Sequence, residues 1–276
     1  VPTNFNQEPI FEMSIPYYQV DTFTNRPFAG NPAGVCLLAQ WLDDALLQKI
    51  AAENNLAETA FVVQRYPSFD LRWFTPTMEV DLCGHATLAP AHVIFTHLGY
   101  LGSEIRFNTK AGELTVSRKA DLLELDFPSR PPAVCSLPPT LEQALGIAPS
   151  FVGKSRDYLA LFDSERIVRE LQPDMVALMQ LDSLGLIVTA PGTDCDFVSR
   201  FFAPKAGVPE DPVTGSAHST LIPFWAHRLG KTHLHAKQIS ARGGELLCED
   251  RGQRVGIAGR AVTYSMGYLL VTAQDP

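Results

Sequence analysis

An acidic residue in an apolar setting is the first candidate for chemistry. Glu58 lies in the segment NLAETAF, between a predicted amphipathic helix and the start of an apolar strand. Burial raises the pKa of a carboxyl group, which would make Glu58 a usable acid and base near neutral pH. A solvated carboxylate at the end of a helix is the alternative interpretation.

Two further candidates stand at the start of a predicted helix. His85 follows Gly84, and the positive end of a helix disfavours an imidazolium, so we expect a neutral imidazole able to relay a proton. The alternative is a histidine that caps its own helix. Cys83 precedes them, and its thiol is either a thiolate with a lowered pKa or a small buried hydrophobic side chain.

The segment EDPVTGSA supplies candidates from the other half of the chain. Asp211 would orient a donor or share a proton, or it forms an Asx turn before Pro212. Ser216 would donate to a substrate carboxylate, or it caps the helix that follows.

The chain repeats itself once. Residues 84–99 read GHATLAPAHVIFTHLG and residues 215–230 read GSAHSTLIPFWAHRLG. Each segment follows a strand-like run with Phe-x-Pro and precedes a Gly-Glu-Leu, which indicates two structurally similar halves. Both segments are apolar on nearly every side, so we expect buried helices over 85–97 and 216–228.

The repeated helix starts point to an anion site. A helix N-terminus exposes unpaired N–H groups and the positive end of the macrodipole, and glycine lets an anion approach the backbone. Two such starts facing each other, at Gly84 and Gly215, would hold a small carboxylate. The alternative is that these glycines serve only tight turns.

These residues need an α+β scaffold of two half-domains, each with a mixed sheet curled around a central helix. We place the first half at 13–127 and the second from residue 128 onward, with 128–139 as the linker and 1–12 as a tag or loose leader. Surface helices are expected over 43–54, 140–145 and 173–179. Strands are expected over 16–23, 33–38, 59–64, 69–74, 104–107, 112–118, 122–127, 158–162, 185–190, 195–202, 236–241, 244–249, 253–259 and 262–273.

Composition excludes several classes of protein. The net charge of −8 argues against a nucleic-acid surface, and no apolar run is long enough for a transmembrane helix. We see no signal peptide, and five scattered cysteines without a CxxC pair favour free thiols in a reducing cytoplasm. The pair His233-x-His235 lacks further ligands, so we expect no metal, and no phosphate-binding or GxSxG motif is present.

Five segments in order resemble the phenazine-biosynthesis PhzF-like isomerase family. They read VDTF (20–23), GNPA (30–33), LAETAF (56–61), CGHAT (83–87) and EDPVTGSA (210–217). The resemblance spans the chain from about residue 14 to its end. It implies the diaminopimelate-epimerase-like fold, with the site between the half-domains, and a homodimer. In that family the last strand returns to the first half, so the half-domains would be 13–127 plus 262–276 and 128–261.

The resemblance also implies roles for individual residues. The catalytic glutamate falls on Glu58, the histidine on His85, the aspartate on Asp211 and the serine on Ser216. The protein would be a cofactor-independent isomerase that moves a proton on a small carboxylate-bearing substrate, held near the glycine turns and Cys83. Epimerases of this fold use two cysteines, and the second half has no cysteine closer to Asp211-Pro212 than Cys195, which disfavours that reaction. A non-catalytic binding protein on the same fold is the other alternative.

Overall fold

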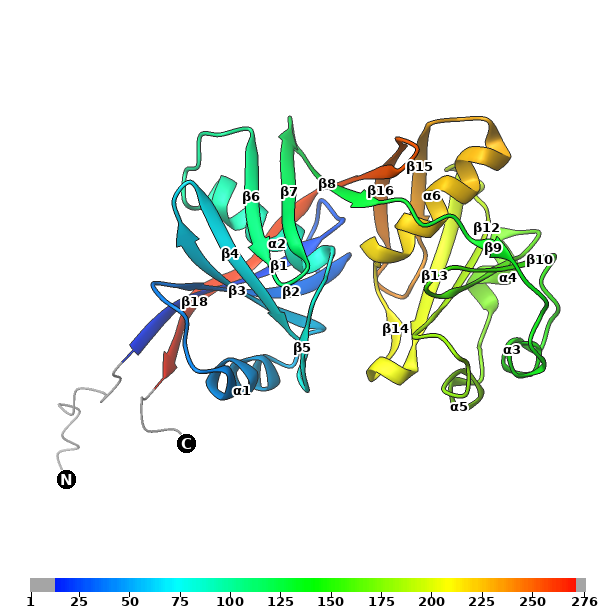
Figure 1. Cartoon of the computed structure of the whole chain (residues 1–276), viewed down its shortest axis with the longest axis horizontal. Coiled ribbons are helices and arrows are strands. Elements are labelled where there is room, and N and C mark those ends of the chain that lie inside the picture. Colours follow the sequence, from blue (N-terminus) through cyan, green and yellow to red (C-terminus); the bar gives the residue numbers. More distant parts are fainter. Residues whose placement is uncertain (1–12, 272–276) are drawn as a thin grey trace, which may run out of the picture.

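Each half of the chain curls a mixed sheet around one buried helix, and the two halves lie side by side (Figure 1). The computed structural model describes residues 13–271. The predicted leader over 1–12 and the end of the predicted last strand, 272–273, lie outside the described residues, as do 274–276. Within the described part of the chain, no helix is long and apolar enough to cross a membrane.

The first half holds helices α1 and α2 and a sheet completed by the last strand of the chain. β18 pairs antiparallel with β1 from Met13↔Val271 to Thr22↔Ala261. The elements are β1 (Met13–Thr22), β2 (Asn31–Leu38), α1 (Asp44–Asn54), β3 (Glu58–Arg65), β4 (Ser68–Phe74), β5 (Glu79–Val80), α2 (His85–Thr96), β6 (Glu104–Thr109), β7 (Gly112–Lys119), β8 (Leu122–Pro128) and β18 (Ala261–Val271).

The second half repeats this plan around helix α6. Its strands β11, β12, β13, β15, β16 and β17 pair in that order. The elements are β9 (Ala133–Val134), α3 (Pro139–Leu145), β10 (Phe151–Lys154), β11 (Tyr158–Leu161), α4 (Glu165–Glu170), α5 (Met175–Leu178), β12 (Leu186–Pro191), β13 (Phe197–Ala203), the 3-10 turn η1 (Pro204–Ala206), β14 (Val208–Asp211), α6 (Gly215–Leu229), β15 (His233–Gln238), β16 (Gly244–Asp250) and β17 (Arg254–Gly259).

Both repeat helices are buried, as predicted. Ten of the twelve residues of α2 and ten of the fifteen residues of α6 are buried. A tryptophan in each half adds a hydrogen bond to the packing: Trp73 Nε1 donates to Ala86 O at 2.9 Å, and Trp225 Nε1 donates to Thr189 Oγ1 at 2.9 Å. The first bond holds the start of α2 against β4 and thereby helps to position the residues around it.

Strand β8 joins the halves at the predicted boundary. It pairs with β7 of the first half and, over Leu123–Pro128, with β17 of the second. The predicted linker 128–139 leaves this strand and contains the two-residue strand β9, which pairs with β10. The division into half-domains stays a prediction in its exact bounds, because one strand serves both sheets.

Several predicted bounds need correction. The strand predicted over 236–241 is β15, which begins at His233, because Leu234, Ala236 and Gln238 alternate into the core. The helix predicted over 173–179 is limited to Met175–Leu178. Five further elements were not predicted, because segments of six residues or fewer show too little periodicity to be recognised: β5, β9, β10, α4 and β14.

Candidate active site

The two helix starts meet at the contact between the half-domains. A Cβ built on Gly84 would lie 3.2 Å from the Cα of Gly215, and one on Gly215 would lie 3.4 Å from the Cα of Gly84. Neither helix has a side-chain cap at its N-terminus. Because Gly84 and Gly215 have no side chains, the positive N-terminal ends of the two helices can approach each other. This arrangement favours a bound anion between or beside them.

A local repeat relates the two helix starts. Thr87 Oγ1 donates to the carbonyl of Cys83, and the ring of His218 contacts the carbonyl of Thr214 through Nδ1 at 2.8 Å. In each pair the carbonyl belongs to the residue just before the glycine, Gly84 or Gly215, and the side chain to the residue three positions after it. Thr214 therefore occupies, in the second half, the position that Cys83 occupies in the first.

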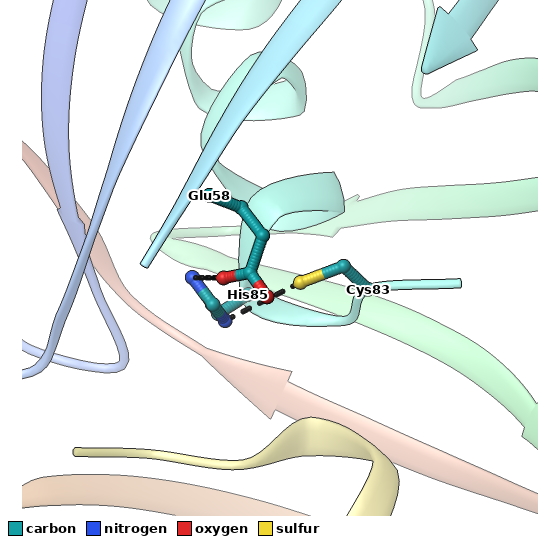
Figure 2. Close-up of side chains that lie close together, drawn as sticks. All are labelled: Glu58, Cys83 and His85. Carbon is teal, nitrogen blue, oxygen red and sulfur yellow. Dashed lines mark hydrogen bonds and ion pairs between the residues drawn. The ribbon is translucent and has the colours of Figure 1, made fainter. Parts of the chain in front are cut away.

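Glu58 reaches His85 across the end of the first-half sheet. Helix α1 ends at Asn54, Asn55 turns the chain with a φ of 47°, and Glu58 opens β3 with its Cα paired to Ala33 of β2. Its Oε2 lies 3.1 Å from Nε2 of His85, and the side chains are 18% and 4% exposed. Figure 2 shows the carboxylate of Glu58 above the imidazole ring. Glu58 is thus neither fully solvated nor far from the glycine turns.

The neutral imidazole expected at His85 stays a prediction. The donor Nδ2 of Asn31 lies 3.1 Å from Nδ1 of the ring, which favours a neutral ring with Nδ1 as the acceptor, whereas the charges around the ring act in the other direction. Burial by itself lowers the pKa of His85, but the neighbouring Cys83 and Glu58 side chains outweigh burial and raise that pKa well above its usual value. Burial raises the pKa of the Cys83 thiol, and a protonated thiol carries no charge. The carboxylate of Glu58 is therefore the group that favours the imidazolium.

Cys83 is buried and contacts the other ring nitrogen of His85 from the one that Glu58 contacts. Its Sγ is 3.5 Å from Nδ1 of His85. Burial, followed by the charge of Glu58, raises the pKa of the thiol, so the expectation of a helix-stabilised thiolate is wrong. The interpretation as a small buried side chain fits the structure better.

Asn31, which the sequence analysis quoted only within the GNPA segment, connects the two halves. Its Nδ2 lies 2.7 Å from Oδ1 of Asp211, 2.9 Å from the carbonyl of Val213 and 3.1 Å from Nδ1 of His85. The opposite amide orientation would set its oxygen against two acceptors, so the nitrogen must face them. Asn31 is fully buried at the start of β2, and only its position in the fold reveals its role.

Asp211 ends β14 and is held by both halves. Its Oδ2 accepts from Thr214 Oγ1 at 2.5 Å, which explains why Thr214 does not cap α6. Burial raises the pKa of Asp211 to about 6. The charge of Glu58 adds to this rise, and the charge of His85 acts against it. Asp211 therefore changes charge closer to neutral pH than an ordinary aspartate.

Two residues that the sequence analysis did not single out hold these loops in place. The buried Gln238 accepts from Thr214 N at 2.8 Å and donates to the carbonyl of Asp211 at 2.8 Å. Arg242, from the second half, donates to Gly30 O at 2.8 Å and to the buried carboxylate of Asp21 at 2.8 Å. No motif in the sequence indicates either contact, because each depends on the pairing of distant strands.

All seven predicted site residues line one cavity between the half-domains. Its volume is about 180 Å³. That volume is below the range of about 300–1,000 Å³ for drug-sized ligands, so it suits a small metabolite. Arg156 also lines it and was missed from the sequence. The predicted residues at its wall are Glu58, Cys83, Gly84, His85, Asp211, Gly215 and Ser216.

The same cluster contains a donor set that metals can use. Ligand atoms of Glu58, Cys83 and His85 lie within 4.8 Å of one another. Glu58 contacts Nε2 of the ring, whereas Cys83 contacts Nδ1 (Figure 2). Because one metal ion would use only one ring nitrogen, this arrangement suits proton transfer along the ring better than a shared ion.

Comparison with known proteins shows which family the chain resembles over most of its length. Residues 20–267 match the family described as phenazine biosynthesis-like protein, PhzC-PhzF. An uncharacterized isomerase of Pseudomonas aeruginosa is 53% identical over 257 residues, covering 93% of this chain and 99% of that protein. The crystal structure of a PhzF family protein from Enterococcus faecalis has a TM-score of 0.92 at 46% identity, covering 94% of this chain and all of that one.

A more distant structure extends the likeness in fold alone. A predicted epimerase from Pseudomonas aeruginosa is 20% identical, with a TM-score of 0.74, and covers 94% of this chain and 100% of that one. The predicted diaminopimelate-epimerase-like fold, with two pseudo-symmetric halves, is thereby confirmed. Because the family model matches residues 20–267 and a relative named an isomerase is 53% identical over nearly the whole chain, the protein belongs to the phenazine biosynthesis-like PhzC-PhzF family.

Proposed function

We propose that the protein is a cofactor-independent isomerase that moves a proton on a small carboxylate-bearing metabolite by general acid–base catalysis. The observation that carries the proposal is the position of Glu58. Its carboxylate lines a cavity beside two uncapped helix starts and lies 3.1 Å from the buried imidazole of His85.

The proton transfer follows from this arrangement. Glu58 takes a proton from a carbon of the substrate, and the electron pair of the broken C–H bond moves toward the substrate carboxylate. The backbone N–H groups at Gly84 and Gly215, with Ser216, stabilise the negative charge that develops there. Glu58 then returns the proton to the same or another carbon, so that no oxidant or co-reactant is needed.

His85 and Asp211 assist the transfer from opposite sides of Asn31. Nε2 of His85 lies 3.1 Å from Oε2 of Glu58, so the ring holds the carboxylate in place for the transfer. Oδ1 of Asp211 accepts from Nδ2 of Asn31 at 2.7 Å and holds the amide in place. The same nitrogen lies 3.1 Å from Nδ1 of His85 and limits the movement of its ring. We propose both as assisting groups and Glu58 as the residue that carries the proton.

The alternatives find less support. A binding protein without activity should leave Glu58 exposed or its cleft filled, whereas the carboxylate is 18% exposed and lines a cavity. A two-thiol epimerase needs a second cysteine across the site, and Thr214 stands in the position related to Cys83 by the internal repeat. Among the described residues that line the cavity, Cys83 is the sole cysteine.

The test is hydrogen exchange at carbon. Small carboxylic and amino acids are incubated with the protein in heavy water, and deuterium incorporation is followed by NMR and mass spectrometry. We expect at least one acid to exchange, and Glu58→Gln to reduce the rate by about a thousandfold with the melting temperature unchanged. Glu53→Gln, an exposed residue of α1, is the control and should exchange as the wild type does. Full exchange in Glu58→Gln would refute the assignment.

We further propose a homodimer in a reducing compartment. Four side chains on one face of β18 are exposed, and within residues 13–271 this strand pairs with β1 alone. Light scattering of the purified protein tests the assembly. The five cysteines are all free, as a reducing compartment requires. The exposed residues are Tyr264, Met266, Tyr268 and Leu270.

A further inference from the structure

The cavity wall has one permanently cationic side chain among the described residues, and that is Arg156. Three carboxyl groups line the same space, those of Glu58, Asp81 and Asp211. A carboxylate ligand placed among them would be repelled unless a positive group faced it. The chemistry of the proposed function therefore needs a cation other than His85, whose Nε2 already contacts Glu58.

Arg156 is held in place by a buried partner. It lies in the turn between β10 and β11, and its Nε donates to Oδ2 of Asp157 at 3.2 Å. The Asp157 side chain is 5% exposed, and its other oxygen accepts from Gly185 N at 2.9 Å. The contact with Asp157 therefore holds the guanidinium group through Nε. The other two nitrogens, Nη1 and Nη2, remain available to a ligand in the cavity.

The free end of Arg156 points to the start of α6. Its Nη2 lies 3.4 Å from Oγ of Ser216, a weak contact that a better acceptor would replace. Ser216 is next to Gly215, where the helix has no side-chain cap. A guanidinium, a hydroxyl and unpaired N–H groups thus converge on one corner of the cavity, a combination that suits a carboxylate bound by two parallel hydrogen bonds.

The neighbouring wall is apolar. It comes from the second half and consists of the end of β13, the turn η1, the start of β14 and the loop before β12. A ligand whose anion sits at Arg156 would lay its carbon body against this surface and expose it to Glu58 opposite. The residues are Leu184, Phe201, Ala203, Ala206 and Val208.

We propose that Arg156 is the residue that binds the carboxylate of the substrate, and that the ligand is a small monocarboxylate with a compact apolar body. The inference rests on the proposed function for the carboxylate itself and adds the residue that recognises it. Arg156 is a binding residue in this scheme, and Glu58 remains the group that moves the proton.

Binding of matched probes tests this inference without knowledge of the substrate. Benzoate and benzamide have the same shape and differ in charge, and their affinities are measured by calorimetry and ligand-observed NMR. We expect the wild type to prefer benzoate, and Arg156→Gln to weaken benzoate binding about 10- to 100-fold while leaving benzamide unchanged. Arg156→Lys keeps the charge but loses the fork, so its affinity for benzoate should be intermediate.

Three controls make the outcome decisive. Arg166→Gln removes an exposed arginine of α4 paired with Glu170 and should bind benzoate as the wild type does. Asp81→Asn removes a negative charge from the wall and should leave benzoate binding equal or stronger. Glu58→Gln should also retain benzoate, so that loss of exchange with intact binding separates catalysis from recognition. Equal benzoate affinity in Arg156→Gln and wild type, or no binding of benzoate by the wild type, would overturn the inference even if deuterium exchange succeeds.

Discussion

The amide of Asn31 donates to the carboxylate of Asp211 across 2.7 Å, although the two residues stand 180 positions apart in the chain. One opens β2 in the first half and the other closes β14 in the second. This contact is one of several that join the half-domains, and it lies next to the ring of His85. The same contact therefore helps to hold the two halves together and to position the groups that would transfer the proton.

Replacement of Asn31 by alanine tests this coupling. The variant leaves Asp211 Oδ1 and the carbonyl of Val213 without their shared donor. Each buried group left unpaired costs about 1–3 kcal/mol. We expect the free energy of unfolding in urea to fall by about 2–4 kcal/mol. Asn108→Ala removes an exposed amide on β6 that donates to Asp70, and it should change stability by less than about 0.5 kcal/mol. Equal losses in the two variants would contradict the role given to Asn31.

The raised pKa of Asp211 predicts a specific dependence of stability on pH. Its folded pKa is about 6, against an ordinary value of 3.8. Between these values the folded protein holds a proton that the unfolded chain has released, so stability falls as pH rises through this window. The full effect is up to about 3 kcal/mol, since one pKa unit corresponds to about 1.4 kcal/mol.

Asp211→Asn should remove that part of the pH dependence. The measurement is the difference in unfolding free energy between wild type and variant, taken from pH 4 to pH 6.5 by chemical denaturation. We expect the difference to shift in favour of the variant as pH rises, because the amide stays neutral. A difference that does not change with pH would show that Asp211 is not the titrating group.

The contact between the helix starts predicts unequal effects of two similar substitutions. A Cβ on Gly84 would lie 3.2 Å from backbone of the opposite half, whereas one on Gly215 would lie at 3.4 Å, an ordinary contact. We expect Gly84→Ala to cost about 1–2 kcal/mol and Gly215→Ala less. Gly267→Ala, on β18 with no atom within 4 Å of its Cβ, should be neutral or stabilising. Thermal unfolding of the three variants is the check, and a larger loss in Gly215→Ala than in Gly84→Ala would contradict the packing argument.

Cys83→Ala separates a carboxylate base from a thiol base. Burial raises the pKa of the Cys83 thiol, so it is protonated at neutral pH and a poor base. We expect the variant to retain deuterium exchange within about tenfold of the wild type, against the much larger loss in Glu58→Gln. Alkylation by iodoacetamide at pH 7 should be slow at this position. A thousandfold loss of exchange in Cys83→Ala would instead assign the proton transfer to sulfur.

The internal repeat was the most useful feature of the sequence, because it predicted both buried helices and the meeting of their starts. Residues 84–99 and 215–230 have the same length and apolar pattern, and the central helices α2 and α6 form within these two segments. Short elements such as β14 and α4 could not be predicted in the same way. The strand β14 nevertheless delivers Asp211 to the site, since it pairs with β13 across a bulge.

The charge of His85 depends on a neighbour that the sequence does not reveal. The helix start argues for a neutral ring, but the carboxylate of Glu58 at 3.1 Å is a closer and stronger charge. The sequence separates these two residues by 27 positions, and only the fold brings them together. The position of His85 at a helix start was therefore not enough to predict the charge of its ring.

The sequence by itself determined the family, the two-fold plan of the chain and which residue types carry the chemistry, because motifs and hydrophobic periodicity are local properties of the chain. The tertiary structure alone decided the partners: Asn31 with Asp211, Arg156 with Ser216, and the glycines with each other. Contacts of this kind depend on the register of distant strands and on the burial that folding creates. Both the charge of a side chain and its hydrogen bonds are set by those neighbours.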